Sequence, residues 1–129
     1  MARPSAAHLS RRERQIMDII YRRGHASVSE VLGDMEDPPS YSAVRALMRI
    51  LEEKGHLKHR KEGNKYIYLP TRSRREASNS ATRRLLETFF DGSTAKAVAA
   101  LLEVSDLQPG DKELDRLAEM IEKARKEGR

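Results

Sequence analysis

The sequence predicts a mainly α-helical protein that carries one β-hairpin. Apolar residues recur at helical spacing through the first 54 residues and again from about residue 74 onwards. Between residues 57 and 69 the period changes towards two, which is typical of strands. Proline, glycine and aspartate clusters separate these segments. The predicted order is therefore three helices, a hairpin, and three more helices.

Two capping boxes predict where the first two helices begin. In the pattern Ser-Arg-Arg-Glu at residues 10–13, the hydroxyl caps the helix and the carboxylate reaches back to the capping residue's amide. This first helix is expected to run to about Arg23, where Gly24 supplies a stop. Ser-Val-Ser-Glu at residues 27–30 repeats the pattern and predicts a short second helix.

A third helix is predicted from the N-cap Ser40 to Lys54-Gly55. Asp37-Pro38-Pro39 turns the chain before it, because prolines lack the amide donor and push the preceding residue towards extended conformations. Its two faces differ in chemistry. The apolar face, on which Met48 is expected to be packing, consists of Val44, Leu47, Met48 and Leu51. The opposite face is small, hydroxylated and cationic, and consists of Ser42, Arg45, Ala46 and Arg49.

The hairpin is predicted from residues 57–62 and 65–69, joined by the turn pair Gly63-Asn64 and ended by Pro70. Basic residues gather in it, namely Lys58, Arg60, Lys61 and Lys65. Tyr66 and Tyr68 share one face, and both are expected to pack on the helices rather than stack on bases.

The last three helices are predicted over residues 74–90, from a cap at Ser93, and from a cap at Asp111. They are too short for a core of their own and need a partner, most simply a second copy of the chain. We therefore predict two domains, an N-terminal one at 1–71 and a dimerisation domain at 72–129. The predicted dimerisation residues are Leu85, Leu86, Phe89, Phe90, Val98, Leu101, Leu102, Leu114, Leu117 and Ile121.

Composition limits the function classes. The absence of cysteine excludes disulfides, thiol catalysis and Cys-ligated metals. No apolar run approaches the roughly 18 residues of a membrane span, and no secretory signal is visible, so we expect a cytoplasmic protein without membrane insertion. Of the net charge of +5, residues 1–71 hold 13 Lys or Arg against 9 Asp or Glu, residues 72–90 hold 5 against 2, and residues 91–129 hold 7 against 9. A polyanionic partner is therefore expected to contact the N-terminal part.

Three helices followed by a basic hairpin form the winged helix-turn-helix pattern, whose third helix enters the DNA major groove. We expect Arg45 to read a guanine, the alanine methyls to contact thymine, and Ser40, Tyr41 and the hairpin to contact the backbone. The predicted DNA-binding residues are Ser40, Tyr41, Ser42, Ala43, Arg45, Ala46, Arg49, Arg60, Lys61, Asn64 and Lys65. An alternative stays open, a winged-helix module that binds an acidic partner protein without DNA.

The sequence contains none of the common catalytic or metal-binding motifs. There is no glycine-rich phosphate loop, nucleophile elbow or HExxH motif. His56 and His59, three residues apart on a strand, would point to opposite faces instead of chelating a metal. The sequence therefore predicts no enzyme, no metal site and no cofactor.

Several ordered motifs resemble the penicillinase-repressor family of bacterial transcription factors, the BlaI/MecI/CopY type. They are LSRRERQIMDII at 9–20, VSEVL at 28–32, YSAVR at 41–45, LEEKG at 51–55, YIYLP at 66–70 and FFDGS at 89–93. The resemblance covers roughly residues 8 to 122 and implies a homodimeric repressor on a promoter palindrome, with an intertwined C-terminal segment. Copper-responsive members use C-terminal cysteines, so that route is excluded here.

In relatives that control β-lactamase genes, a membrane receptor protease triggers cleavage of an Asn-Phe bond in the C-terminal segment. The position that matches it here is Ala100-Leu101, so a different cognate protease would have to accept this bond. The recognition helix of the family often carries Thr where this sequence has Ala43 and Ala46. The resemblance therefore does not carry over the operator sequence.

Overall fold

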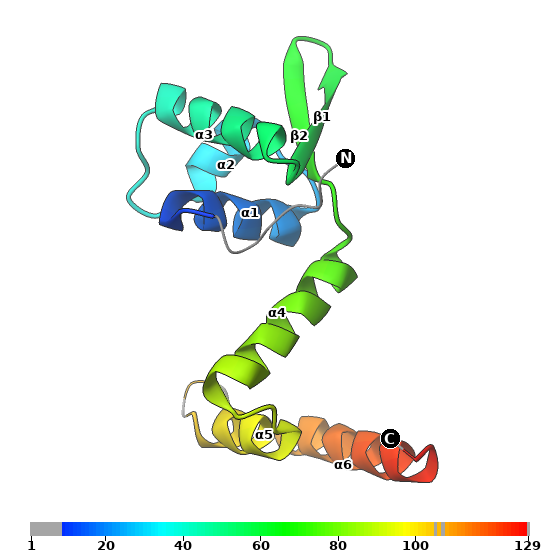
Figure 1. The fold of residues 1–129 in the computed structure, drawn as a ribbon. Coiled ribbons are helices and arrows are strands. Elements are labelled where there is room, and N and C mark those ends of the chain that lie inside the picture. The colour runs from blue at the N-terminus through cyan, green and yellow to red at the C-terminus, as the bar shows by residue number, and fades with distance from the viewer. Residues whose placement is uncertain (1–8, 105, 107, 129) are drawn as a thin grey trace. The chain divides into compact units, whose positions relative to one another are not determined.

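The computed structural model describes residues 9–104, 106 and 108–128, and its elements follow the predicted order (Figure 1). The first part contains α1 (Arg11–Arg23), α2 (Val28–Asp34), α3 (Tyr41–Glu53), β1 (Leu57–Glu62) and β2 (Lys65–Pro70). The second contains α4 (Arg74–Phe89), α5 (Thr94–Glu103) and α6 (Asp111–Lys126). The chain divides into two compact units, one extending to residue 79 and the other beginning at residue 80, inside α4.

Both predicted capping boxes are present and begin α1 and α2. The Ser10 hydroxyl accepts from the amide of Glu13 at 3.1 Å, and the Glu13 carboxylate accepts from the amide of Ser10 at 2.8 Å. Ser27 and Glu30 repeat the exchange at 3.2 and 3.0 Å. Gly24 ends α1 at a φ of 87°, a conformation that favours glycine.

The turn before α3 departs from the expectation for a residue that precedes proline. Asp37 has a φ of 48°, in the left-handed region, instead of an extended conformation. Aspartate enters this region more readily than most residues other than glycine. The Asp37-Pro38-Pro39 segment still separates α2 from α3, and the Ser40 hydroxyl caps α3 by accepting from the amide of Ala43 at 3.2 Å.

The core of the first unit lies among α1, α2, α3 and the base of the hairpin. The predicted apolar face of α3 points into it, with Val44, Met48 and Leu51 fully buried and Leu47 packed against the cluster. The largest buried side chains come from four different elements, and they are Ile16, Ile20, Val31, Val44, Met48, Leu51 and Leu57. A sequence with four such interlocking elements needs no other chain to bury this core.

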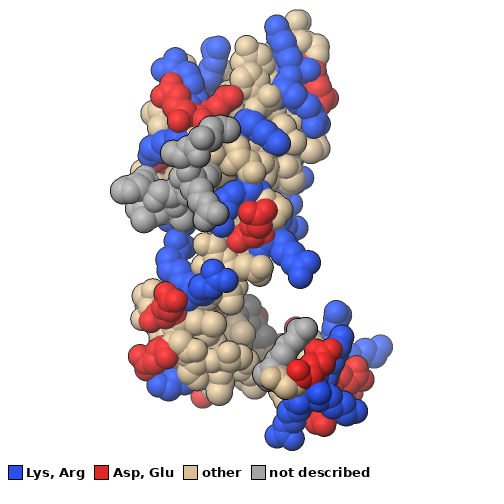
Figure 2. All heavy atoms as spheres, turned by 45° about the vertical axis from the view of Figure 1, so that its right-hand side comes forward, with Lys and Arg blue, Asp and Glu red and all other residues tan. Residues whose placement is uncertain are grey.

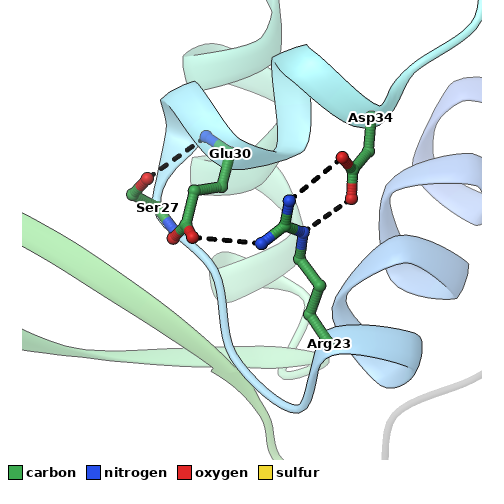
Figure 3. Close-up of polar contacts among 4 residues, drawn as sticks. All are labelled: Arg23, Ser27, Glu30 and Asp34. Atoms are coloured by element: carbon green, nitrogen blue, oxygen red, sulfur yellow. Dashed lines mark hydrogen bonds and ion pairs between the residues drawn. The ribbon is translucent and has the colours of Figure 1, made fainter.

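Two polar contacts connect the helices around this core. Arg23, in the last turn of α1, donates to both carboxylate oxygens of Asp34 at 2.6 and 3.0 Å and to Glu30 at 3.0 Å (Figure 3). It thereby joins α1 to both ends of α2. Lys54, just after α3, donates to the buried carboxylate of Glu13 at 2.8 and 2.9 Å, which joins the end of α3 to the start of α1.

The hairpin is antiparallel and is attached to the helices at its base. Leu57 pairs with Pro70, and Glu62 pairs with Lys65 beside the turn. Ala26, between α1 and α2, exchanges two backbone hydrogen bonds with Tyr68, at 3.0 and 2.8 Å. Tyr68 is 5% exposed, as predicted, but the prediction for Tyr66 was wrong, since that ring is 44% exposed. Ile67 and Tyr68 are the buried residues of β2, and Tyr66, one position nearer the turn, is not buried.

In the second unit, none of the described residues of α5 and α6 is buried, and α4 also buries none. Six of the ten side chains predicted for dimerisation are exposed in the single chain, from 41% for Leu102 and Leu114 to 72% for Phe89. The other four, Leu86, Phe90, Val98 and Leu117, are half-buried. The cap predicted at Asp111 was wrong, because Gly110 occupies the N-cap and makes no side-chain hydrogen bond. Ser93 does cap α5, as predicted, by accepting from the amide of Lys96 at 3.1 Å.

Candidate nucleic-acid interface

The face of α3 opposite the core is exposed along its whole length. Ser42, Arg45, Ala46 and Arg49 are all exposed, whereas Val44 and Met48 on the other side are buried. This arrangement follows from the helical period, which places residues three and four apart on the same side. The outer face of α3 thus presents two guanidinium groups among short side chains.

A groove runs between this face of α3 and the hairpin. It is formed by two adjoining hollows, which share Tyr41, Arg45, Tyr66 and Tyr68. One hollow adds the N-terminal end of α2 and the hairpin residues Lys61, Asn64 and Lys65. The other adds Ser42, Ala46, Arg49, Glu52 and His59. We call the two together the α3–hairpin groove.

The α3–hairpin groove is cationic. Among the described residues, no ion pair engages Arg45, Lys61 or Lys65, all of which line it. Arg49 forms only a loose contact with Glu53, at 3.8 Å between highly exposed side chains. A pair of this kind contributes little, so the Arg49 charge is available to a ligand. On the visible face of Figure 2, Lys and Arg side chains are more prominent than acidic ones over the first unit.

The one carboxylate that lines the groove, that of Glu52, is held by a histidine. His59 Nδ1 lies 2.7 and 2.8 Å from the two Glu52 oxygens, and both side chains are about one-third exposed. The His59 ring also stacks on Tyr66, with centroids 4.4 Å apart and planes inclined by 18°. Burial raises the pKa of Tyr68 next to this pair, and the Glu52 carboxylate adds to the rise. The α3–hairpin contact therefore fixes the Tyr66 ring in the groove wall.

The two faces of the hairpin have different surroundings. Residues paired across an antiparallel ladder share a face, so Lys61 lies with Tyr66, and Arg60 lies with Ile67 on the other face. Arg60 lines neither hollow, and its guanidinium pairs with Glu62 at 2.7 Å. Arg60 is thus outside the groove, whereas Lys65, which pairs with Glu62 on the face of Arg60, lines the groove at the hairpin turn.

Eight of the eleven predicted DNA-binding residues line the groove together. Ser40, Ala43 and Arg60 do not, and the hydroxyl of Ser40 serves as the cap of α3. Sequence reasoning missed Glu52, His59, Tyr66 and the serines beside the start of α2, Ser27 and Ser29. For Tyr66 a signal existed, because strand alternation places it on the face of Lys61. That these residues contact DNA stays a prediction.

Three further observations concern membrane spans, metal ligands and the predicted cleavage position. None of the helices in the described part of the chain is long and apolar enough to cross a membrane. Within those same described residues, no three histidine or acidic side chains come together in a way that could hold a metal ion. Ala100 and Leu101, the predicted cleavage position, lie inside α5, with Leu101 55% exposed.

Comparison with known proteins identifies the family. A model of the penicillinase repressor family matches residues 9–123. The chain belongs to the penicillinase repressor family. The match confirms the resemblance seen in the sequence motifs. The family is one of transcriptional repressors and not of enzymes.

The chain is also similar to two curated proteins and to one solved domain. The chain is 23% identical to the penicillinase repressor of Bacillus licheniformis over 116 residues, 88% of this chain and 89% of that protein. It is 27% identical over 101 residues to a 16.5 kDa protein of Latilactobacillus sakei, covering 77% of this chain and 69% of that one. The solution structure of the DNA-binding domain of the repressor BlaI, at 23% identity, covers 55% of this chain and 89% of that one with a TM-score of 0.49.

Proposed function

We propose that this family member represses transcription by binding a palindromic promoter operator as a homodimer through the α3–hairpin groove. The observation that carries the proposal is the groove itself, in which Arg45 and Arg49 from α3 and Lys61 and Lys65 from the hairpin converge. Four cations face one acidic side chain there, and that carboxylate is held by His59. A polyanion would gain from all four charges at once.

Shape and chemistry favour duplex DNA as the polyanion. The major groove is about 12 Å wide and admits one α-helix, so α3 would enter it with its exposed face towards the bases. Arg45 would donate two hydrogen bonds to a guanine, and the methyl group of Ala46 would contact a thymine. Lys61, Asn64 and Lys65 would contact the sugar-phosphate backbone, which adds affinity without sequence choice.

The second unit supports the homodimer. Its helices expose Phe89, Leu101 and Ile121 at 72%, 55% and 57%, in a part of the chain where no described residue is buried. Apolar area of this kind is stabilised by removal from water, at about 25 cal/mol per Å². A two-fold dimer would place its two recognition helices on half-sites about one helical turn, roughly 34 Å, apart.

We further propose that a signal-dependent protease, with a membrane receptor protease as its source, relieves repression by cutting Ala100-Leu101. This bond lies within α5, so the helix must open locally before a protease can bind it in an extended form. Cleavage would separate Leu101 and all of α6 from the rest of the proposed dimer surface. Mass spectrometry of the chain from induced cells would detect a fragment ending at Ala100, and an intact chain after induction would contradict relief by this route.

The proposal as a whole is tested by binding to duplex DNA of random sequence at low salt, followed by genomic footprinting. A repressor with this groove binds random duplex weakly and in a salt-dependent way, and protects palindromic promoter sites in the genome. The rival function is a module that binds an acidic partner protein. Failure to bind random duplex at low salt would favour that rival, since the cationic groove should give non-specific affinity.

A further inference from the structure

We propose that the first unit carries a second anion site, built for phosphate groups, in a cavity at the base of the hairpin. Its walls come from the end of α1, from both strands and from the segment that leads into α4. Five of its lining residues are basic, namely Arg22, Arg23, Lys58, Arg72 and Arg74. None of the described residues that line it is acidic, although the Glu76 carboxylate is near enough to raise the pKa of Tyr21 in its wall. We call it the hairpin-base cavity.

Most of these cations are available to a ligand. Arg23 is committed to Asp34 and Glu30, which hold it at both ends of its guanidinium (Figure 3). Among the described residues, no ion pair engages Arg22, Lys58, Arg72 or Arg74. Arg72 makes only a long contact, 3.5 Å, with the backbone carbonyl of Glu76. Four basic side chains thus surround one hollow without carboxylate partners.

The C-terminal end of α1 disfavours anion binding in this cavity, but only weakly. A helix C-terminus carries a partial charge of about −0.5, and α1 ends at Arg23 beside this cavity. Four positive side chains outweigh that partial charge several-fold, even after allowance for their exposure to solvent. The balance of the hairpin-base cavity therefore favours a ligand with more than one negative charge.

The residue types indicate phosphate chemistry. Guanidinium groups donate paired hydrogen bonds that match the oxygens of phosphate, and three of the four available cations are arginines. The half-buried Tyr21, together with Leu69 and Pro70, adds an apolar wall on which a less polar part of a phosphorylated molecule would lie. Burial raises the pKa of Tyr21, so its hydroxyl stays protonated at neutral pH and is a donor.

This cavity is distinct from the α3–hairpin groove. Lys58 pairs with Leu69 on one face of the hairpin, whereas Lys61 pairs with Tyr66 on the other. Lys58 lies near the base of β1, three residues before Lys61 of the groove, or about 10 Å at 3.3 Å per residue. No residue lines both the cavity and the groove. A phosphate bound in one is therefore not the phosphate bound in the other.

The phosphate groups have two conceivable sources, a free phosphorylated small molecule or the backbone of DNA that flanks the operator. The free molecule is favoured, because none of the described residues lines both the cavity and the groove that would hold the duplex. The proposal does not depend on DNA binding by the groove, so its test begins without DNA.

The test is calorimetric titration of pyrophosphate into the full-length chain at physiological ionic strength. We expect saturable binding that weakens about tenfold in the double variant K58A/R72A, because each of these solvent-exposed charges contributes a screened interaction and the two losses together correspond to about a factor of ten. The matched control R75A/R83A also removes two positive charges, at exposed positions that do not line the cavity. It should change the affinity for pyrophosphate less than twofold. Absence of saturable binding, or equal losses in both double variants, would overturn the proposal.

Two duplexes then distinguish the sources. If pyrophosphate still binds in the presence of a short operator duplex and of one with long flanks, the ligand is a free phosphorylated molecule. If only the long duplex displaces it, the cavity takes phosphates of flanking DNA. Displacement by the short duplex would place the anion in the α3–hairpin groove and overturn the proposal.

Discussion

At the scale of single residues, Arg45 is the side chain on which sequence choice by the groove should depend most. It lies on the exposed face of α3, lines both hollows of the groove, and has no ion-pair partner among the described residues. A bidentate arginine–guanine contact is worth about 1–3 kcal/mol of discrimination against another base. We expect Arg45→Ala to lose about tenfold or more in affinity for the operator and to relax preference at one base pair, as measured by binding across operator variants.

The control for this experiment is Arg49→Ala, on the same face of α3, one turn further from the N-terminus. It should weaken binding to all variants alike if Arg49 contacts phosphate. A loss in Arg45→Ala that is equal across every operator variant would mean that Arg45 contributes charge without reading a base.

Glu13 gives a stability prediction with a defined pH dependence. Burial alone would raise the pKa of Glu13, but hydrogen bonds from Lys54 and Ser10 offset this and leave the pKa below its ordinary value of 4.5. A carboxylate whose folded-state pKa is lowered stabilises the fold above the unfolded-state value, and this contribution disappears as the pH falls through the folded-state pKa. We expect Glu13→Gln to destabilise the first unit by about 1 kcal/mol at pH 7, because the charged contact with Lys54 is lost.

Denaturant unfolding of the wild-type chain and of Glu13→Gln, at pH 7 and at successively lower pH, measures this difference. The gap between the two proteins should narrow below pH 4.5 and close at lower pH. Glutamine also fits the capping box, so Glu13→Gln keeps the cap of α1 and the comparison reports on the charge alone. A gap that stays constant with pH would show that the Glu13 charge does not stabilise the fold.

The tyrosines of the hairpin show where sequence reasoning ends at this scale. The alternation of side chains along a strand correctly placed Tyr66 and Tyr68 on one face of the hairpin. Whether a side chain on that face is buried depends on how far the helices extend along the strand. Tyr68 is covered because Ala26 pairs with it, a contact between residues 42 positions apart that no local pattern reports. Arg60 lines neither hollow of the groove, and its ion pair with Glu62 was not foreseen, so its contact with DNA stays a prediction.

At the scale of elements, the starts and ends of α1, α2 and α3 were predictable because each is decided by local chemistry. Capping hydroxyls, Gly24 and the proline pair act within one helical turn. The register of the hairpin was equally local, since Gly63-Asn64 fixes a two-residue turn. The groove between α3 and the hairpin was not predictable in detail, because it depends on the packing of elements that the sequence separates.

Substitutions in the hairpin can test whether its two basic residues Arg60 and Lys61 contribute differently to DNA binding. Lys61 lines the groove without an ion pair among the described residues, whereas Arg60 lies on the other face, paired with Glu62. If Lys61 neutralises one DNA phosphate, Lys61→Ala should reduce the slope of log affinity against log salt by about 1. The matched variant Arg60→Ala should leave that slope nearly unchanged. Operator binding measured at several salt concentrations tests both, and equal slopes for Lys61→Ala and the wild type would exclude a phosphate contact by Lys61.

At the scale of the whole molecule, the two compact units differ in how far their apolar side chains are buried. The first buries Ile16, Met48, Leu51 and their neighbours in a core of its own. In the second, no described residue of α4, α5 or α6 is buried, although each helix carries apolar residues at helical spacing, Phe89, Leu101 and Ile121 among them. The periodicity made these helices predictable from sequence, whereas no surface that covers them occurs among the described residues of the single chain.

Dimerisation through the second unit can be tested in the full-length chain with one substitution. Phe89 is 72% exposed in the single chain, so Phe89→Asp costs little there, but it would place an unpaired carboxylate in the proposed interface. We expect this variant to dimerise at least about tenfold more weakly, since 1.4 kcal/mol corresponds to a tenfold change. Sedimentation equilibrium measures the dissociation constant directly.

Ile50→Asp is the matched control, because Ile50 is an apolar residue, 37% exposed, on α3 in the first unit. It should leave the monomer–dimer equilibrium unchanged, which separates an interface effect from the general effect of an added charge. Truncation after residue 79, where the first compact unit ends, should give a folded monomer because the buried core lies before that point. A truncated chain that still sediments as a dimer would mean that the winged-helix units associate by themselves, and that the exposed apolar faces of α4, α5 and α6 serve a different partner.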